Sequence, residues 1–321
     1  MKKTYTLFAV MFLAVGLCFY SCTKDEKDGG TQTTNNPDPE PEPDPLPDTL
    51  VVNVSTVPTT RNVLIEEFTG NRCQYCPLGH KAANDVVAAL GSDKVFVINY
   101  HVPGGLANAY TTIAGNVFNS VFNVDESGHY SIPAGLINRH DFNNGTAKLT
   151  EQRDNYMAAA NQVAAMPACA NIAAAASINR NSRELKVKVQ VYYTADGTGS
   201  TNKLFVALIQ NNVMGTQSGS SYNPAQVVGT QYRHNEMFLK FLSRFSYSTV
   251  LHTYSAGDDI SPVTQGSLIE KEYTYTIPES FKDTENNTTE AAVLENLEVV
   301  VFVVENTQEV INVCKAPIVI R

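Results

Sequence analysis

Two cysteines separated by two residues are the residues of this chain best suited to chemistry. Cys73 and Cys76 form a C-x-x-C motif, which follows an apolar stretch at 63–68 and precedes a helical pattern. A cysteine near the N-terminus of a helix is favoured as the thiolate, because the helix dipole places partial positive charge there. The thiolate attacks disulfides, and the second cysteine can close a disulfide with the first. The spacing therefore indicates a dithiol redox site.

Two other interpretations of the motif stay open. The same spacing can form half of a zinc site, with His80 as a third ligand. Structural zinc needs four ligands and the sequence offers no clear fourth, so neither a metal nor another cofactor is expected. His80 is then interpreted as a residue on a helix surface. The second alternative is a fixed disulfide between Cys73 and Cys76 that only holds the turn together.

The first 21 residues resemble the export signal of a bacterial lipoprotein. Lysines at positions 2 and 3 precede an apolar run at 7–17, which is too short to span a bilayer comfortably. The run leads to Phe19-Tyr20-Ser21-Cys22, which resembles a lipoprotein cleavage box although Phe19 and Ser21 depart from the usual residues. We expect Cys22 to be acylated and to anchor the chain in a membrane; Cys18 is a rival, and an ordinary cleaved secretion signal is the alternative.

Residues 22–60 have the composition of an extended tether. Proline alternates with acidic residues at 37–45, and such a segment cannot bury a core. The acidic residues after Cys22 resemble the surface-export signal of Bacteroidetes lipoproteins. The expected location is therefore the outer membrane, with the cell surface and the periplasmic leaflet both open.

The remaining chain divides by pattern into two predicted domains. At 61–166 apolar strands alternate with helices, which predicts an α/β domain. At 167–321 strand patterns and turn signals follow one another with little helix, which predicts an all-β, immunoglobulin-like sandwich. The predicted strands are 63–68, 94–102, 132–138, 168–178, 184–194, 203–213, 268–277, 297–305 and 310–320, and the predicted helices are 78–90, 108–122 and 147–166.

The residues before the C-x-x-C motif resemble those of the thioredoxin superfamily. Glu67 falls where thioredoxins keep a buried acid, and Phe68 falls on their strand phenylalanine. Pro133, in Ser131-Ile132-Pro133, resembles their cis-proline, which lies opposite the motif and lets a peptide pair beside it. Arg72 departs from the usual tryptophan. The resemblance implies that the first domain is thioredoxin-like, with Glu67 beneath the reactive cysteines.

These residues give a mechanism of thiol–disulfide exchange. Cys73 would attack a substrate disulfide, and Cys76 would resolve the mixed disulfide. Glu67 could move the proton of Cys76, and Arg72 would favour the Cys73 thiolate electrostatically. The expected partners are thiols or disulfides of exported proteins. The net charge of −9 argues against nucleic acid as a partner.

The whole arrangement resembles the 28-kDa outer-membrane protein family of Bacteroidetes. The likeness is carried by the lipoprotein box, the acidic tether, the T-G-x-x-C-x-x-C-P sequence at 69–77 and the all-β second half, with Tyr232-Arg233-His234-Asn235 as a further match. The resemblance implies location and architecture rather than activity. The alternative function is therefore a cell-surface binding or adhesion protein that uses the thioredoxin fold as a scaffold.

The second domain offers two further candidates. Cys169 and Cys314 could form a disulfide, as an even pair often does in an exported protein, or could be two buried free thiols. Aromatic residues could form a binding face for a peptide or glycan, but such a cluster is more often core. Paired acids at 66–67 and 258–259 are interpreted as surface residues. The aromatic cluster comprises Tyr222, Tyr232, His234, Phe238, Phe241, Phe245 and Tyr247.

Overall fold

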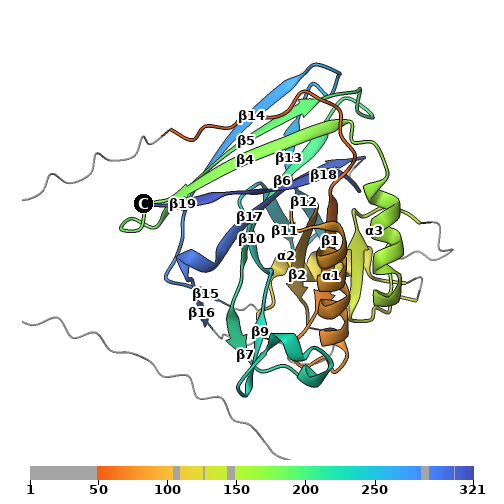
Figure 1. The fold of residues 1–321 in the computed structure, drawn as a ribbon, viewed down its shortest axis with the longest axis vertical. Coiled ribbons are helices and arrows are strands. Elements are labelled where there is room, and N and C mark those ends of the chain that lie inside the picture. The colour runs from red at the N-terminus through yellow and green to blue at the C-terminus, as the bar shows by residue number, and fades with distance from the viewer. Residues whose placement is uncertain (1–48, 104–108, 126, 143–148, 283–288, 307) are drawn as a thin grey trace, which may run out of the picture. The chain divides into compact units, whose positions relative to one another are not determined.

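An eight-stranded mixed sheet forms the centre of the computed structural model, which describes residues 49–103, 109–125, 127–142, 149–282, 289–306 and 308–321 (Figure 1). Its β1 runs parallel to β2 and antiparallel to β3. Both faces of β1 are covered, so its residues form a continuous buried run rather than an alternating one. The strands in spatial order are β18 (Glu309–Ala316), β17 (Leu297–Glu305), β6 (Asn202–Gln210), β10 (Met237–Phe241), β2 (Val95–His101), β1 (Val63–Thr69) and β3 (Ala134–Ile137), with β13 (Asp258–Ile260) also paired to β6.

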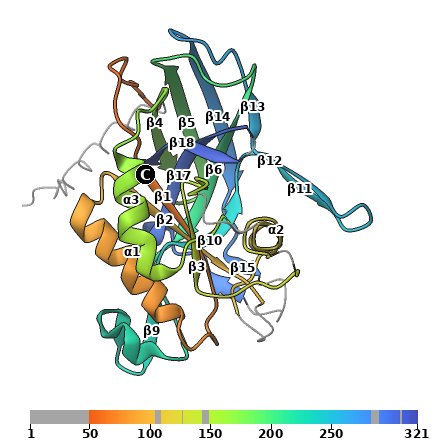
Figure 2. The ribbon, with the colours of Figure 1, turned by 90° about the vertical axis from the view of Figure 1, so that its right-hand side faces the viewer.

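Three helices cover this sheet from two sides (Figure 2). The helices α1 (Cys76–Leu90) and α3 (Tyr156–Ala164) pack together over one face of β1 and β2, and α2 (Ile113–Phe122) packs into the core on the opposite face. Helix α1 ends as predicted at Gly91, whose φ of 102° favours glycine. The predicted helix at 147–166 is shorter in the structure, where α3 follows a 3-10 turn at Arg153–Asn155.

A four-stranded sheet packs against the other half of the central sheet. Its strand β5 alternates half-buried and buried residues, which is the pattern of a strand with one face on a core. The prediction that 167–321 is all-β is confirmed. The sheet contains β14 (Leu268–Thr276), β5 (Glu184–Tyr193), β4 (Ala170–Ile178) and β19 (Ile318–Ile320). The predicted strand at 310–320 is divided at Pro317, which separates β18 from β19.

Three small sheets complete the described part of the chain. The sheet of β7, β9 and β8 lies beside one end of α1 and carries the segment that joins β7 to β8 (Figure 1). The strands are β7 (Val213–Gly215), β8 (Val227–Val228), β9 (Gln231–His234), β11 (Phe245–Ser248), β12 (Thr253–Ala256), β15 (Ser280–Lys282) and β16 (Thr289–Ala291).

The central sheet crosses the predicted domain boundary at 166/167. In β2 Asn99 pairs with Met237 of β10, so strands from both segments share one ladder. The sheet also curls, because Val310 N of β18 donates to Asn138 O directly after β3, over 2.8 Å. The two segments therefore share a core. Whether each folds by itself stays a prediction.

The predicted disulfide between Cys169 and Cys314 is absent, and both are free thiols. The reason is their register. Asn312 Nδ2 donates to Ala170 O, and Ile318 pairs with Ala176, so the residues on either side of Cys314 meet β4 beyond Cys169 rather than at it. A disulfide needs Cα atoms closer than about 7 Å.

The export signal, Cys22 and most of the tether lie outside the described residues. Within the described ranges no helix has both the length and the apolar composition to cross a membrane.

Candidate active site

Cys73 and Cys76 form a disulfide in the turn between β1 and α1. The turn begins after β1 ends at Thr69, and Cys73 N donates to Gly70 O over 3.1 Å. Helix α1 begins at Cys76, and a proline follows in its first turn, where the missing N–H costs nothing. The strand–turn–helix prediction is confirmed. Only 5% of Cys73 is exposed and none of Cys76, so the disulfide is covered.

The loop before β3 lies beside this disulfide. The Ile132–Pro133 peptide bond is cis, as predicted. Cys73 Sγ lies 3.7 Å from the carbonyl oxygen of Ile132. A methyl group at Gly79, on the first turns of α1, would overlap both the Glu67 carboxyl and the Pro133 ring. The fold thus brings Cys73, Pro133 and Glu67 together from three elements.

Glu67 is fully buried, as its likeness to the buried acid of thioredoxins implied, and the interpretation of the pair at 66–67 as surface residues is wrong. Neither of its carboxyl oxygens has a hydrogen-bond partner in the described structure, and His80 Nε2 lies 3.8 Å from Oε1. Burial raises the pKa of Glu67 well above its usual value, and the negative charge of Glu236 raises it further. Both effects favour the protonated, neutral form of this carboxyl group.

Glu66 is also fully buried, on the opposite face of β1, and it is paired. Arg139 Nε and Nη2 donate to its two oxygens over 2.6 and 2.7 Å, and the Tyr100 hydroxyl donates to Oε1 over 2.9 Å. The Arg139 guanidinium lies 4.9 Å from the Phe118 ring centre and 5.0 Å from that of Phe122. This ion pair belongs to the core, which is why a carboxylate tolerates burial there.

His80 is buried on the inner face of α1, so its interpretation as a surface residue is also wrong. The Tyr232 hydroxyl donates to Gln226 Oε1 over 2.8 Å and therefore accepts from His80 Nδ1, also over 2.8 Å. His80 Nε2 then accepts from the Thr69 hydroxyl, again over 2.8 Å. Burial lowers the pKa of His80 to about 3, and the imidazole is neutral. Its spacing from Cys76 and Ala83, both buried, was the sequence signal for this orientation.

Two further buried histidines lie beyond Tyr232. The His234 ring lies 5.2 Å from the Tyr232 ring and 5.4 Å from that of His101, which in turn contacts Tyr110 at 5.3 Å. Burial lowers the pKa of His234 to about 4 and that of His101 well below its usual value. His234 was a candidate from the sequence but His101 was not, and their contact was missed because they come from β9 and β2, which are far apart in sequence.

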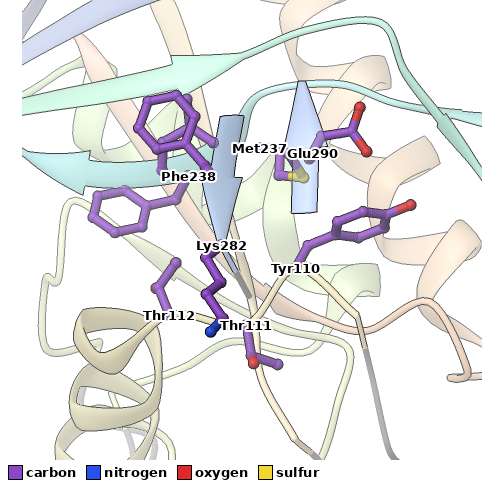
Figure 3. A pocket seen from close by; sticks show the side chains of 9 residues that line it. Tyr110, Thr111, Thr112, Met237, Phe238, Lys282 and Glu290 are labelled. Atoms are coloured by element: carbon purple, nitrogen blue, oxygen red, sulfur yellow. The ribbon is translucent and has the colours of Figure 1, made fainter. Parts of the chain in front are cut away.

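Tyr110 also borders a small pocket, drawn in Figure 3. Its cavity volume is about 50 Å³. Pockets for small molecules usually measure about 300–1,000 Å³, so this one does not fit a cofactor. It is lined by Tyr110, Thr111, Thr112, Met237, Phe238, Leu239, Phe281, Lys282 and Glu290.

The aromatic cluster predicted in the second half is mostly core. Tyr232, His234, Phe238 and Phe241 are buried, whereas Tyr222 is 41% and Tyr247 37% exposed. Tyr222 lies against the C-x-x-C turn, where its ring centre is 5.9 Å from that of Tyr75. A peptide or glycan site at this cluster stays a prediction. Arg72 is exposed directly before Cys73, and the electrostatic role predicted for it is likewise untested.

Comparison with known proteins adds a family to this geometry. The model of the family described as outer membrane protein Omp28 matches residues 124–320, more than half of the chain. The chain belongs to the Omp28 family. This confirms the predicted resemblance to the 28-kDa outer-membrane protein family of Bacteroidetes, and it places the protein in the outer membrane. The family match includes Pro133 but begins after Cys73 and Cys76.

Solved structures similar to this Omp28 family member include two from Porphyromonas gingivalis. HBP35 has a TM-score of 0.55 at 16% identity, over 80% of this chain and 75% of that chain. A domain of the outer membrane lipoprotein Omp28 has a TM-score of 0.28 at 18% identity, over 48% of this chain and 91% of that one. At these identities only the first likeness bears on fold, and neither bears on activity. No curated protein sequence matches the chain significantly.

Proposed function

We propose that this outer membrane protein exchanges thiols and disulfides on exported proteins, through a thioredoxin-like site built from Cys73 and Cys76. The observation that carries the proposal is the disulfide at the start of α1, packed beside cis-Pro133 and above the unpartnered Glu67 carboxyl. The sequence of β1, α1 and β2, with β3 antiparallel after Pro133, supports the thioredoxin-like interpretation of 61–166. A lipid anchor at Cys22 would hold the site in the envelope, where disulfides persist.

The proposed reaction balances with the groups present. A thiolate of a partner dithiol attacks Cys73 Sγ, the bond between the two sulfurs breaks, and Cys76 leaves with the electron pair. Glu67 gives its proton to the Cys76 sulfur and later recovers one from solvent. The second thiolate of the partner then attacks the partner sulfur that is bonded to Cys73. The partner disulfide forms, and Cys73 leaves as a thiolate. The partner is oxidised to a disulfide and the protein is reduced to a dithiol; the reverse sequence reduces a partner disulfide.

The second candidate function is a surface binding protein with a structural disulfide. It is favoured by one observation, the near-complete burial of both cysteines. Reactive thiols are normally accessible, whereas buried ones are inert. The two candidates differ in the reduction potential of the Cys73–Cys76 pair. Structural disulfides of exported proteins have potentials below about −300 mV, and disulfides that take part in exchange have higher ones.

The test combines this potential with capture of a partner. The full chain is equilibrated with glutathione buffers, and the fraction reduced is read by alkylation and mass; exchange requires a potential above about −300 mV. Cys76→Ser should then hold a partner in the envelope as a mixed disulfide on Cys73, because no second thiol resolves it. Cys73→Ser and Cys314→Ser, which leaves the C-x-x-C motif intact, should capture none. A reduction potential below about −300 mV, together with no captured partner, would support the second candidate, in which the disulfide is structural.

A further inference from the structure

A segment from the second half of the chain lies across the C-x-x-C turn. We call residues 216–222, between β7 and β8, the strap; its 3-10 turn packs beside α1 (Figure 1). The Gln217 side-chain amide donates to the carbonyl oxygens of Cys73 and Gly70, over 3.0 and 3.2 Å. Ser218 N donates to Asn71 O over 2.8 Å. The strap thus donates hydrogen bonds to three backbone carbonyl oxygens of the turn.

The contact continues sterically along the strap. Gly219 lies so close to the carbonyl oxygen of Gln74 that a Cβ atom there would overlap it. The Tyr222 ring packs on Tyr75, with 5.9 Å between ring centres. Only a glycine fits this approach, because position 219 also has a φ of 67°. The C-x-x-C turn is therefore contacted by a segment more than 140 residues after it in sequence.

We propose that the strap is a gate that closes the disulfide against partners and must swing away before a partner thiolate can reach Cys73. This inference rests on the proposed exchange function and adds its regulation. The strap is suited to opening, since Thr216, Ser218 and Tyr222 are exposed. Its few hydrogen bonds, each with a modest net contribution, hold it in place.

The released groups define what an incoming partner must offer. When the strap leaves, the carbonyl oxygens of Gly70, Asn71 and Cys73 lose their donors from Gln217 and Ser218. Gly70 O keeps the donor from Cys73 N, whereas the carbonyl oxygens of Asn71 and Cys73 need N–H donors from the docked partner or from water. An extended polypeptide segment carries such donors along its backbone. The strap thus favours a flexible stretch of protein chain over a small thiol as the natural partner.

A pair of glycine substitutions tests the gate. Gly219→Ala pushes the strap away from Gln74, whereas Gly229→Ala introduces the same residue at a similar φ, 60°, with no atom within 4 Å. The oxidised full chain is treated with dithiothreitol, and reduction of the Cys73–Cys76 disulfide is followed by mass-tag alkylation. We expect Gly219→Ala to be reduced about ten-fold faster or more, and Gly229→Ala to match wild type. Equal rates in the two variants would overturn the gate.

A second pair covers the case in which Gly219→Ala does not fold. Gln217→Ala removes the donors to Cys73 and Gly70 without adding an atom. Gln265→Ala makes the same change of residue at an exposed turn and serves as the control. Loss of hydrogen bonds worth about 1.4 kcal/mol together would give a ten-fold faster reduction. If Gln217→Ala and Gln265→Ala both reduce at the wild-type rate, the strap does not control access.

Failure of the gate and failure of the exchange function give different results. Reduction by dithiothreitol needs no natural partner, so a change in its rate between Gly219→Ala and Gly229→Ala reports access to Cys73 and not the exchange function. Suppose that Gly219→Ala is reduced faster, but that the double variant with Cys76→Ser captures no partner. That result supports the gate and rejects the exchange function. If Cys76→Ser captures a partner but Gly219→Ala leaves the rate of reduction unchanged, the result supports the exchange function and rejects the gate.

Discussion

Replacing Glu67 with glutamine tests the role of the carboxyl proton while it keeps the shape of the side chain. Gln has nearly the same volume, but it neither ionises nor delivers a proton at neutral pH. Glu67 is fully buried with both oxygens unpartnered, and its pKa is raised well above its usual value, first by burial. We therefore expect Glu67→Gln to change the pH dependence of stability and to slow exchange at Cys76.

The sign follows from proton binding in the two states. An unfolded glutamate loses its proton at a pKa of about 4.3, whereas folded Glu67 keeps its proton to much higher pH. In that window the folded state binds more protons, so wild-type stability falls as the pH rises, by about 1.4 kcal/mol per pH unit. The Glu67→Gln variant does not lose stability in this way, because its side chain does not ionise. Its stability relative to wild type should therefore rise with pH between about pH 5 and pH 7.

The assay is urea unfolding of both proteins at several pH values in this range. Taking the difference between variant and wild type cancels the contributions of the buried histidines, which both proteins share. Glu270→Gln, at an exposed position on β14, controls for loss of a carboxylate. A difference between Glu67→Gln and wild type that is constant with pH would refute the reasoning, because Glu67 would then ionise equally in both states.

Three other predictions concern the core, the histidines and the anchor. Arg139→Met should lower the free energy of unfolding by about 3–5 kcal/mol in denaturant titrations, since it leaves Glu66 buried without its cation, and Glu66→Gln added to it should recover part of the loss. Because burial lowers the pKa of His80 to about 3 and that of His234 to about 4, the unfolded chain binds the extra protons below about pH 6.5, so stability falls on acidification by about 1.4 kcal/mol per pH unit for each histidine. His234→Gln should reduce that slope, and an unchanged slope contradicts the assignment. Cys22→Ala should move the protein from the membrane to the soluble fraction and remove the lipid mass; retention in the membrane would reject the anchor.

Local pattern was sufficient to predict much of the site. The apolar run at 63–68, the C-x-x-C motif and the helical spacing after it predicted β1, the turn and α1. The cis bond before Pro133 followed from a resemblance rather than from its own sequence, because X-Pro bonds are mostly trans. Elements whose residues are close together in the chain carry their own signals, and these predictions succeeded for that reason.

The covering of the site could not be predicted in the same way. Gln217 and Gly219 lie more than 140 residues after the turn, in a stretch with no apolar periodicity. Met237 of β10 joins β2 through a single registered pair, Asn99, so the shared sheet also left no local pattern. The free thiols at Cys169 and Cys314 depend on a strand register that sequence spacing alone does not fix.

The two adjacent acids on β1 show why Glu67, rather than Glu66, is suited to move a proton. Successive strand residues point to opposite faces, and both faces of β1 are covered, so both acids are buried. Arg139 and Tyr100 hold the Glu66 oxygens with three hydrogen bonds, and a change of charge there would leave a buried cation unpaired. Glu67 has no such bonds to lose. Its proton can therefore be given up without breaking a hydrogen bond, and removal of the Glu66 carboxylate should cost stability while removal of the Glu67 carboxyl should cost exchange.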